Sequence, residues 1–124
     1  MKVIQTNTAP AAIGPYSQAI ISGNFVFVSG QTPLSPENGQ MVGESVSEQA
    51  EQVFKNIGAL LKAAGTSFEK VVKTTCFLTD MNDFAAFNEV YAKYFIGRPA
   101  RSTFAVKGLP KNALVEIEAI AEIA

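Results

Sequence analysis

Apolar residues recur at helical spacing in two segments of the chain, and in most of the remaining segments they alternate with polar residues. In the first helical segment they fall three or four residues apart, at Val46, Ala50, Val53, Ile57, Leu60, Leu61 and Ala64. This spacing predicts a helix with one apolar stripe. Ser45 or Ser47 is the expected N-terminal cap, and Gly65 is the expected end.

A second helix is predicted between residues 80 and 97. Asp80 or Asn82 is suited to accept hydrogen bonds from its first backbone amides. Gly97-Arg98-Pro99 ends it, since proline cannot continue a helix. Its apolar stripe is aromatic and consists of Phe84, Phe87, Tyr91, Tyr94 and Phe95.

Alternating segments in the first two thirds of the chain predict four strands. Residues 17–22 and 25–29 form an expected hairpin around Gly23-Asn24, and residues 2–6 and 71–79 supply the other two strands. The strand over residues 25–29 is apolar on both faces. Such a strand is buried on both sides, so the sheet is expected to be covered twice.

Two more strands are predicted over residues 101–106 and 114–123. The loop between them carries the Gly, Pro and Asn of a hairpin connection, so antiparallel pairing is the default expectation. The apolar positions of both strands should then face the core. Symmetric pairing brings Arg101 close to Glu116 or Glu118, because each residue of offset moves a side chain only about 3.4 Å. An arginine and a glutamate are therefore predicted to share one pocket.

These elements predict an α+β fold: a single mixed sheet of about six strands, with two helices packed on one face. Residues 1–124 are expected to form a single domain, which is the usual organisation at this length. Two helices cover only one face. Because apolar residues such as Val26, Val28 and Ile120 exceed what the helices can reach, the other face is expected to be buried by self-association.

Composition excludes several kinds of function. The net charge is −1 and the ten basic residues are scattered, which argues against a nucleic-acid partner. The N-terminus lacks the long apolar run of a secretory signal or a membrane span, so a cytoplasmic location is the simplest expectation. The chain has no histidine, and Cys76 is its only cysteine. An internal disulfide and the usual zinc and catalytic-triad constellations are thereby excluded.

Several motifs, in order along nearly the whole chain, carry a family resemblance. They are Ala11-Ala12-Ile13-Gly14-Pro15-Tyr16-Ser17-Gln18, Ser29-Gly30-Gln31, Lys73-Thr74-Thr75, Pro99-Ala100-Arg101-Ser102, Gly108-Leu109-Pro110 and Val115-Glu116-Ile117-Glu118-Ala119. Any one of them alone would be a weak signal, but together they make coincidence improbable. In these motifs the chain closely resembles the reactive-intermediate deaminase family, RidA or YjgF.

The resemblance implies a chorismate-mutase-like fold that assembles into homotrimers, with ligand clefts between subunits. It also implies hydrolytic deamination of short enamine and imine acids, namely 2-aminoacrylate/2-iminopropanoate and 2-iminobutanoate, to 2-keto acids and ammonia. No cofactor and no metal are expected. A small imino or keto acid is the expected ligand.

Two residues receive catalytic roles. The guanidinium of Arg101 suits a substrate carboxylate, because its planar fork donates two parallel hydrogen bonds. A carboxylate is suited to moving protons between water and the departing nitrogen. Glu116 and Glu118 share one strand face and both fit this role, and the resemblance selects Glu116. The structural alternative for Arg101 is a cross-strand ion pair.

The remaining candidates would line the cleft and bind substrate, and each also has an ordinary structural reading. They are Tyr16, Ser29, Gly30, Asn88, Ser102 and Thr103. The family often has cysteine where Thr103 stands, so a thiol-dependent step at that position is absent here. The segment before Arg101 is also shorter than in many relatives, which leaves pocket width and substrate preference open. Cys76 is expected to be a small buried apolar residue.

Two other functions compete with the enzyme. A non-catalytic module could bind 2-keto or fatty acids through the same arginine, or regulate a partner protein. Ribonuclease or translation-inhibitor activity, which has been attached to similar proteins, ranks last because the chain has neither histidine nor a basic stripe.

Overall fold

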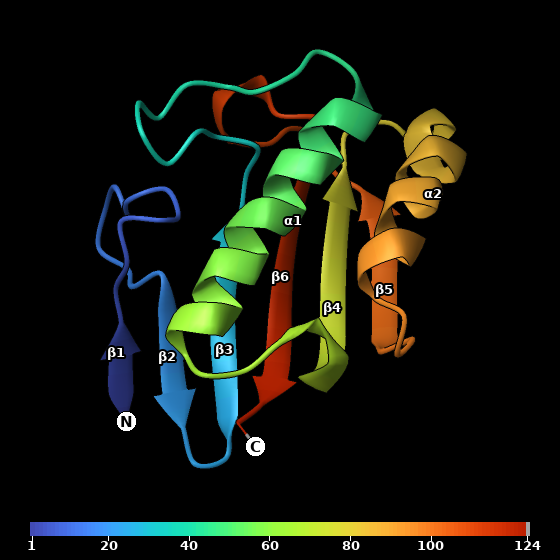
Figure 1. The fold of residues 1–124 in the computed structure, drawn as a ribbon. Coiled ribbons are helices and arrows are strands. Elements are labelled where there is room, and N and C mark those ends of the chain that lie inside the picture. Colours follow the sequence, from blue (N-terminus) through green and yellow to red (C-terminus); the bar gives the residue numbers. More distant parts are fainter. Residues whose placement is uncertain (124) are drawn as a thin grey trace.

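The computed structural model describes residues 1–123 and shows one six-stranded sheet with both helices on the same side of it (Figure 1). The strand order is β1-β2-β3-β6-β4-β5. The strands are β1 (Lys2–Ile4), β2 (Ala19–Ser22), β3 (Phe25–Gln31), β4 (Val71–Leu78), β5 (Ala100–Ala105) and β6 (Val115–Glu122). The helices are α1 (Val46–Ala63) and α2 (Phe84–Tyr94), and short 3₁₀ turns cover Phe68–Lys70, Met81–Asp83 and Pro110–Asn112. The predicted α+β class, with its mixed sheet, is confirmed.

Helix α1 begins and ends as its sequence predicts. The Ser45 side chain accepts a hydrogen bond from the Glu48 backbone N–H, and the Glu48 side chain accepts one from the Ser45 N–H, which completes a capping box. At the other end Gly65 adopts φ +83°, a left-handed conformation that glycine enters without steric cost. The buried side of α1, including Phe54 and Ile57, packs on the sheet. Burying one such side chain stabilises the fold by about 1.5–3 kcal/mol.

Helix α2 is tied to α1 by aromatic and polar contacts. The Asp80 side chain accepts a hydrogen bond from Asn82 N–H and caps the short turn that leads into the helix. The Phe54 ring of α1 packs among the aromatic side chains of α2 and its C-terminal cap. The centroids of contacting rings are 4.4–6.2 Å apart, and the cluster consists of Phe54, Phe87, Tyr91, Tyr94 and Phe95. On the surface, Glu51 accepts hydrogen bonds from Lys93 and Tyr94.

The predicted pairing of the last two strands is wrong. Strand β6 lies in the middle of the sheet, antiparallel to both β3 and β4, and β5 forms the edge, parallel to β4. The reason is topological. A strand, a helix and a following strand, here β4, α2 and β5, usually form a parallel crossover unit. The loop after β5 then carries the chain past β4 to the central position.

Strand faces follow from this register. Val26 and Val28 of β3 face the helices and are buried, so their side of β3 does not need a partner molecule. Phe27 and Phe104 point to the opposite, uncovered face and are 43% and 46% exposed. The apolar positions of β5 that were expected to face the core therefore lie outside it. The uncovered face still exposes large apolar side chains.

Candidate active site

Arg101 lies on β5 and points to the helix-covered side of the sheet. It pairs in register with the fully buried Thr74 of β4, and residues opposite each other on neighbouring strands share a face. Asn88, on α2, accepts a hydrogen bond from the Arg101 guanidinium at 2.8 Å. Asn88, expected only to line the cleft, therefore contacts the arginine directly, and its role in binding substrate stays a prediction.

Aromatic rings fix the plane of this guanidinium. Its central carbon lies 4.6 Å from the Tyr91 ring centroid and 5.5 Å from that of Phe84, both within range of a cation–π interaction. The Tyr91 hydroxyl shares a buried 2.7 Å hydrogen bond with the Thr74 hydroxyl, which holds the ring in place. Burial raises the pKa of Tyr91, so its hydroxyl stays neutral beside the cation.

The guanidinium keeps donors available for a ligand. Arginine has five N–H donors, and the only hydrogen bond from the Arg101 side chain within residues 1–123 goes to Asn88. Arg101 lines a cavity of about 520 Å³ together with Asn88, Tyr91 and Phe95. A half-buried, oriented guanidinium at a cavity wall is suited to binding a carboxylate through two hydrogen bonds.

Glu116 lies on β6 and points to the opposite, uncovered side of the sheet. It pairs in register with Phe77, whereas the neighbouring Ile117 faces the helices. A Cβ atom added to Gly30 would lie 3.0 Å from the Glu116 carboxyl carbon. The absence of a side chain on Gly30 therefore makes room for this carboxyl group. A β-bulge between Val28 and Gln31 lies at this point of β3.

The surroundings of Glu116 change its proton affinity. Burial raises the pKa of Glu116, and the charge of Glu118 raises it further. Glu116 lines a cavity of about 240 Å³ together with Tyr16 and Gly30. Glu118 is exposed on the same face and lines a separate hollow of about 190 Å³ with Lys73. The alternation of the strand placed both glutamates on one face and could not distinguish them. In the structure their surroundings differ, and Glu116 has the more enclosed position.

The predicted shared pocket of Arg101 and Glu116 does not exist within one chain. The two side chains line different cavities and point to opposite faces of the sheet. Strand β4 lies between β5 and β6, so the expected cross-strand neighbourhood is also absent. Each chain carries a guanidinium half-site, formed by Arg101 with Asn88 and Tyr91, and a carboxylate half-site, formed by Glu116 with Gly30 and Tyr16.

The family model described as Endoribonuclease L-PSP matches residues 6–123. The chain belongs to this family, also called YjgF/RidA. A mouse relative named 2-iminobutanoate/2-iminopropanoate deaminase is 54% identical over 97% of this chain and 90% of its own. A Lactococcus lactis relative, named as a candidate regulator, AldR, is 55% identical over 99% of this chain and 98% of its own.

Solved structures of the family share the fold. The crystal structure of Escherichia coli TdcF with bound serine has a TM-score of 0.95 and 44% sequence identity, and each chain is covered in full. The six-stranded α+β architecture of this YjgF/RidA chain is therefore that of its family.

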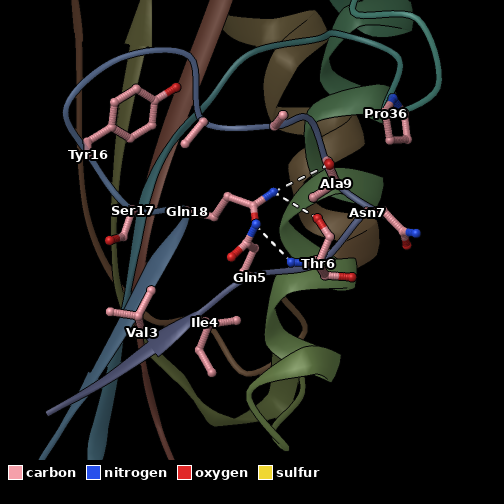
Figure 2. Close-up of a pocket in the computed structure, with 12 residues that line it drawn as sticks. Val3, Ile4, Gln5, Thr6, Asn7, Ala9, Tyr16, Ser17, Gln18 and Pro36 are labelled. Atoms are coloured by element: carbon pink, nitrogen blue, oxygen red, sulfur yellow. Dashed lines mark hydrogen bonds between the residues drawn. The ribbon is translucent and has the colours of Figure 1, made fainter.

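The segment that carries Tyr16 in this YjgF/RidA chain is held by one buried glutamine. Gln18 accepts a hydrogen bond from Thr6 N–H at 2.8 Å and donates to the Thr6 and Pro10 carbonyls at 3.0 and 2.8 Å. This side chain lines a hollow of about 750 Å³. Figure 2 shows Gln18 beside Thr6 and Ala9, with Tyr16 on the loop above it. Gln18 thus holds residues 6–10 next to the start of β2.

Ser29 and Ser102 occupy positions that limit their predicted roles. The Ser29 N–H donates to the Gln18 carbonyl at 3.0 Å, and its hydroxyl donates to the Ser17 carbonyl at 2.6 Å. Both of its donors are therefore used to hold the Tyr16 loop. Ser102 is exposed and points to the uncovered face, away from the guanidinium of Arg101.

Thr103 shares the helix-covered face with Arg101 and pairs in register with Cys76. Its hydroxyl oxygen is buried and has no hydrogen-bond partner among residues 1–123. Cys76 is fully buried, as predicted. Burial raises the pKa of this thiol to about 11. The thiol therefore stays protonated at neutral pH.

Sequence reasoning missed Tyr91 and Gln18 as parts of the site. Tyr91 was assigned only to the aromatic stripe of its helix, but its hydroxyl and its place one turn after Asn88 were available signals. Gln18 ends the first of the family motifs, but its role could not be predicted, because hydrogen bonds to carbonyls 8–12 residues away leave no mark in local patterning. Within residues 1–123 no helix is long and apolar enough to cross a membrane. The same residues contain no cluster of three or more His, Cys, Asp or Glu side chains that could hold a metal ion.

Proposed function

We propose that this protein hydrolyses short-chain 2-imino acids, 2-iminopropanoate and 2-iminobutanoate, to 2-keto acids and ammonia. The observation that carries the proposal is an oriented guanidinium with unused donors in a chain that is 54% identical to a mouse deaminase of this name. Because this identity covers nearly all of both chains, we infer the same substrates and the same reaction for this protein as the name of the mouse relative states.

Arg101 binds the substrate carboxylate, and Asn88 and the Tyr91 ring hold the guanidinium in its plane. The bound carboxylate places the neighbouring C=N carbon at a fixed distance from the arginine. Because the guanidinium is partly buried and already oriented, little side-chain entropy is lost when the substrate binds.

Glu116 directs the water. Its carboxylate accepts a proton as the water oxygen bonds to the iminium carbon, and it then delivers a proton to the nitrogen. The hydroxyl proton then passes to the Glu116 carboxylate as the C=O bond forms, the C–N bond breaks, and ammonia leaves. A pKa raised by burial suits a group that must both accept and donate a proton.

The complete site forms between subunits of a homotrimer. Arg101 of one subunit and Glu116 of its neighbour line one cleft, since a single chain holds them in separate cavities. The uncovered face supplies the apolar surface for assembly, including Phe27 and Phe104. Tyr16 and Gly30 enter the cleft with Glu116, and Asn88 enters with Arg101. A cytoplasmic location stays a prediction.

The test is the decay of freshly generated 2-iminobutanoate in the presence of purified protein. Arg101→Ala is expected to lower kcat/KM by about a hundredfold or more, and Arg101→Lys is expected to recover only part of it, because an ammonium cannot form the paired contact. Lys62→Ala, at an exposed position in the last turn of α1, is the matched control. Full activity in Arg101→Ala would contradict the assignment.

A second candidate function is a regulatory module that binds a 2-keto acid without turnover, which the name of the Lactococcus lactis relative favours. Glu116→Gln separates the two. If the protein is an enzyme, Glu116→Gln lowers the rate of imine hydrolysis and keeps the affinity for 2-ketobutanoate. If it is a binding module, the variant also keeps this affinity, but even the unmodified protein does not hydrolyse the imine.

A further inference from the structure

Helix α1 buries two amide side chains among its apolar ones. Gln49 and Asn56 are 4% and 1% exposed and lie about two helical turns apart. An amide is costly to bury unless hydrogen bonds satisfy it, so each of the two is expected to have specific partners. The proposed function gives neither residue a role.

The side chain of Asn56 holds the loop that follows β3. Its Nδ2 group donates hydrogen bonds to the Thr32 and Leu34 carbonyls at 3.1 and 3.0 Å, and its Oδ1 accepts one from Gln52 at 2.9 Å. Both N–H donors of the amide are thereby used on one short stretch of backbone. Thr32 and Leu34 line the cavity of about 240 Å³ that contains Glu116. Asn56 therefore fixes one wall of that cavity.

The side chain of Gln49 holds the start of β6. Its Oε1 accepts a 2.8 Å hydrogen bond from the Leu114 N–H, and its Nε2 donates to the Gly43 carbonyl at 3.2 Å. Leu114 immediately precedes β6, and Glu116 is the second residue of that strand. Gln49 therefore ties the strand end that carries the Glu116 carboxyl to the loop before α1.

The Glu116 carboxyl is sensitive to the placement of both segments. It packs so closely on Gly30 that a Cβ atom there would lie 3.0 Å from the carboxyl carbon. Gly30 comes shortly before Thr32, the first carbonyl that Asn56 binds. A shift of this stretch, or of the start of β6, would move the cavity wall against the carboxyl and change how much water reaches it.

We propose that Asn56 and Gln49 are positioning residues for imine hydrolysis. They hold the two backbone segments that enclose the Glu116 carboxyl, and so set the angle and the depth at which it directs water. This proposal rests on the proposed function and deepens it. Arg101 lines a different cavity, so the substrate anchor is left unchanged when either amide is removed. The effect is therefore expected in kcat rather than in KM.

The kinetic test removes each amide with little change in size. In Asn56→Leu and in Gln49→Met, kcat for 2-iminobutanoate is expected to fall about tenfold while KM changes less than about twofold, because small displacements of a reacting group are costly in rate. Gln49→Glu keeps the acceptor for the Leu114 N–H and should restore most of the rate. The two positions give independent variants, so the test remains if one of them does not fold.

Ile57→Val is the matched control. Ile57 is fully buried in the same helix, and this change removes only a methylene group from the core. It is expected to lower the urea midpoint of unfolding and to keep kcat. If Asn56→Leu and Gln49→Met behave in the same way, with a lower midpoint and an unchanged kcat, the two amides are merely structural and the proposal is overturned.

The titration of the Glu116 carboxyl, followed by carbon-13 NMR and assigned with Glu116→Gln, tests the positioning role without turnover. Burial raises the pKa of Glu116. A loosened wall admits water, so this pKa should move down towards its ordinary value in Asn56→Leu and Gln49→Met and stay in place in Ile57→Val. The other ionisable groups near it are Tyr16 and Lys111 at the cavity and Glu118 on the same strand, and none of them is changed in these variants.

The two measurements keep the positioning role separate from the proposed function. A lowered pKa of Glu116 in both variants, with no turnover in the unmodified protein, would support the role of the amides and overturn only the proposed reaction. A pKa that stays raised in both variants would overturn the positioning role and leave the reaction intact.

Discussion

Arg101 and Glu116 are held by opposite electrostatic means. The guanidinium of Arg101 has a hydrogen-bond acceptor and two aromatic rings around it, which stabilise its charge as they fix its position. The Glu116 carboxyl is partly buried and has the like charge of Glu118 nearby, and both destabilise its charged form. The cation is thus set to bind an anion, and the carboxyl is set to exchange protons.

The raised pKa of Glu116 predicts how stability depends on pH. The folded protein holds this proton to a higher pH than the unfolded chain, whose carboxyl has its ordinary value near 4.5. The stability that comes from this difference is present below the ordinary value and is lost as pH rises through the raised one. In Glu116→Gln that loss is expected to be absent. Urea denaturation of both proteins across this pH range measures the difference.

The same group predicts the pH dependence of the rate. In the unmodified protein kcat/KM is expected to rise with pH through the raised pKa of Glu116, and Glu116→Gln is expected to lower kcat by about a hundredfold or more. Glu118→Gln is the matched control. Removing the charge of Glu118 should move the rise to lower pH without abolishing activity, because that charge contributes to the shift. An unchanged pH profile in Glu118→Gln would contradict this electrostatic coupling.

At the scale of elements, the loop before β2 is held in large part by one amide side chain, that of Gln18. Gln18→Ala removes the partners of the Thr6 N–H and of the Thr6, Ala9 and Pro10 carbonyls, which is expected to cost about 1–3 kcal/mol in free energy of unfolding. Because Tyr16 lies on this loop, kcat/KM should fall as well. Gln5→Ala, at an exposed position of the same segment, is the control. Wild-type stability in Gln18→Ala would show that the loop is held by other contacts.

Local patterns predicted the elements, but they did not predict all strand partners. The cap of α1 at Ser45, the hairpin at Gly23 and the aromatic stripe of α2 depend on neighbouring residues, and the structure has them as expected. The first strand is shorter than predicted, ending at Ile4. Apolar and polar residues alternate in the same way whether a strand pairs with the next strand in sequence or with a more distant one. The pairing of β5 with β4 is therefore invisible to periodicity.

The candidate site shows the same limit. Parity placed Glu116 and Glu118 correctly on one face, and the same-face relation of Arg101 and Thr103 also holds. The side of the sheet that each set faces is decided by the helices, which cover the even-numbered apolar residues of β3 and the odd-numbered ones of β6. In β5 the more apolar side is the uncovered one. For this reason a pocket shared by Arg101 and Glu116 was predicted within a chain that cannot form it.

At the scale of the whole molecule, two half-sites and an uncovered apolar face are consistent with a single arrangement. In a closed ring each subunit presents one patch to the next and a different patch to the previous one. The guanidinium half-site and the carboxylate half-site lie on opposite faces of the sheet, so one subunit can present them to two different neighbours. Activity should therefore belong to neighbouring pairs of subunits.

Subunit mixing tests this arrangement directly. Arg101→Ala and Glu116→Gln are each expected to be inactive, but refolding an equimolar mixture should restore about a quarter of the wild-type rate. In a randomly assembled ring of three, about three quarters of the molecules are mixed, and each of these joins one intact Arg101 to one intact Glu116. The double variant refolded with Arg101→Ala is the control and should stay inactive. If mass spectrometry finds mixed trimers without activity, both residues must act from the same subunit.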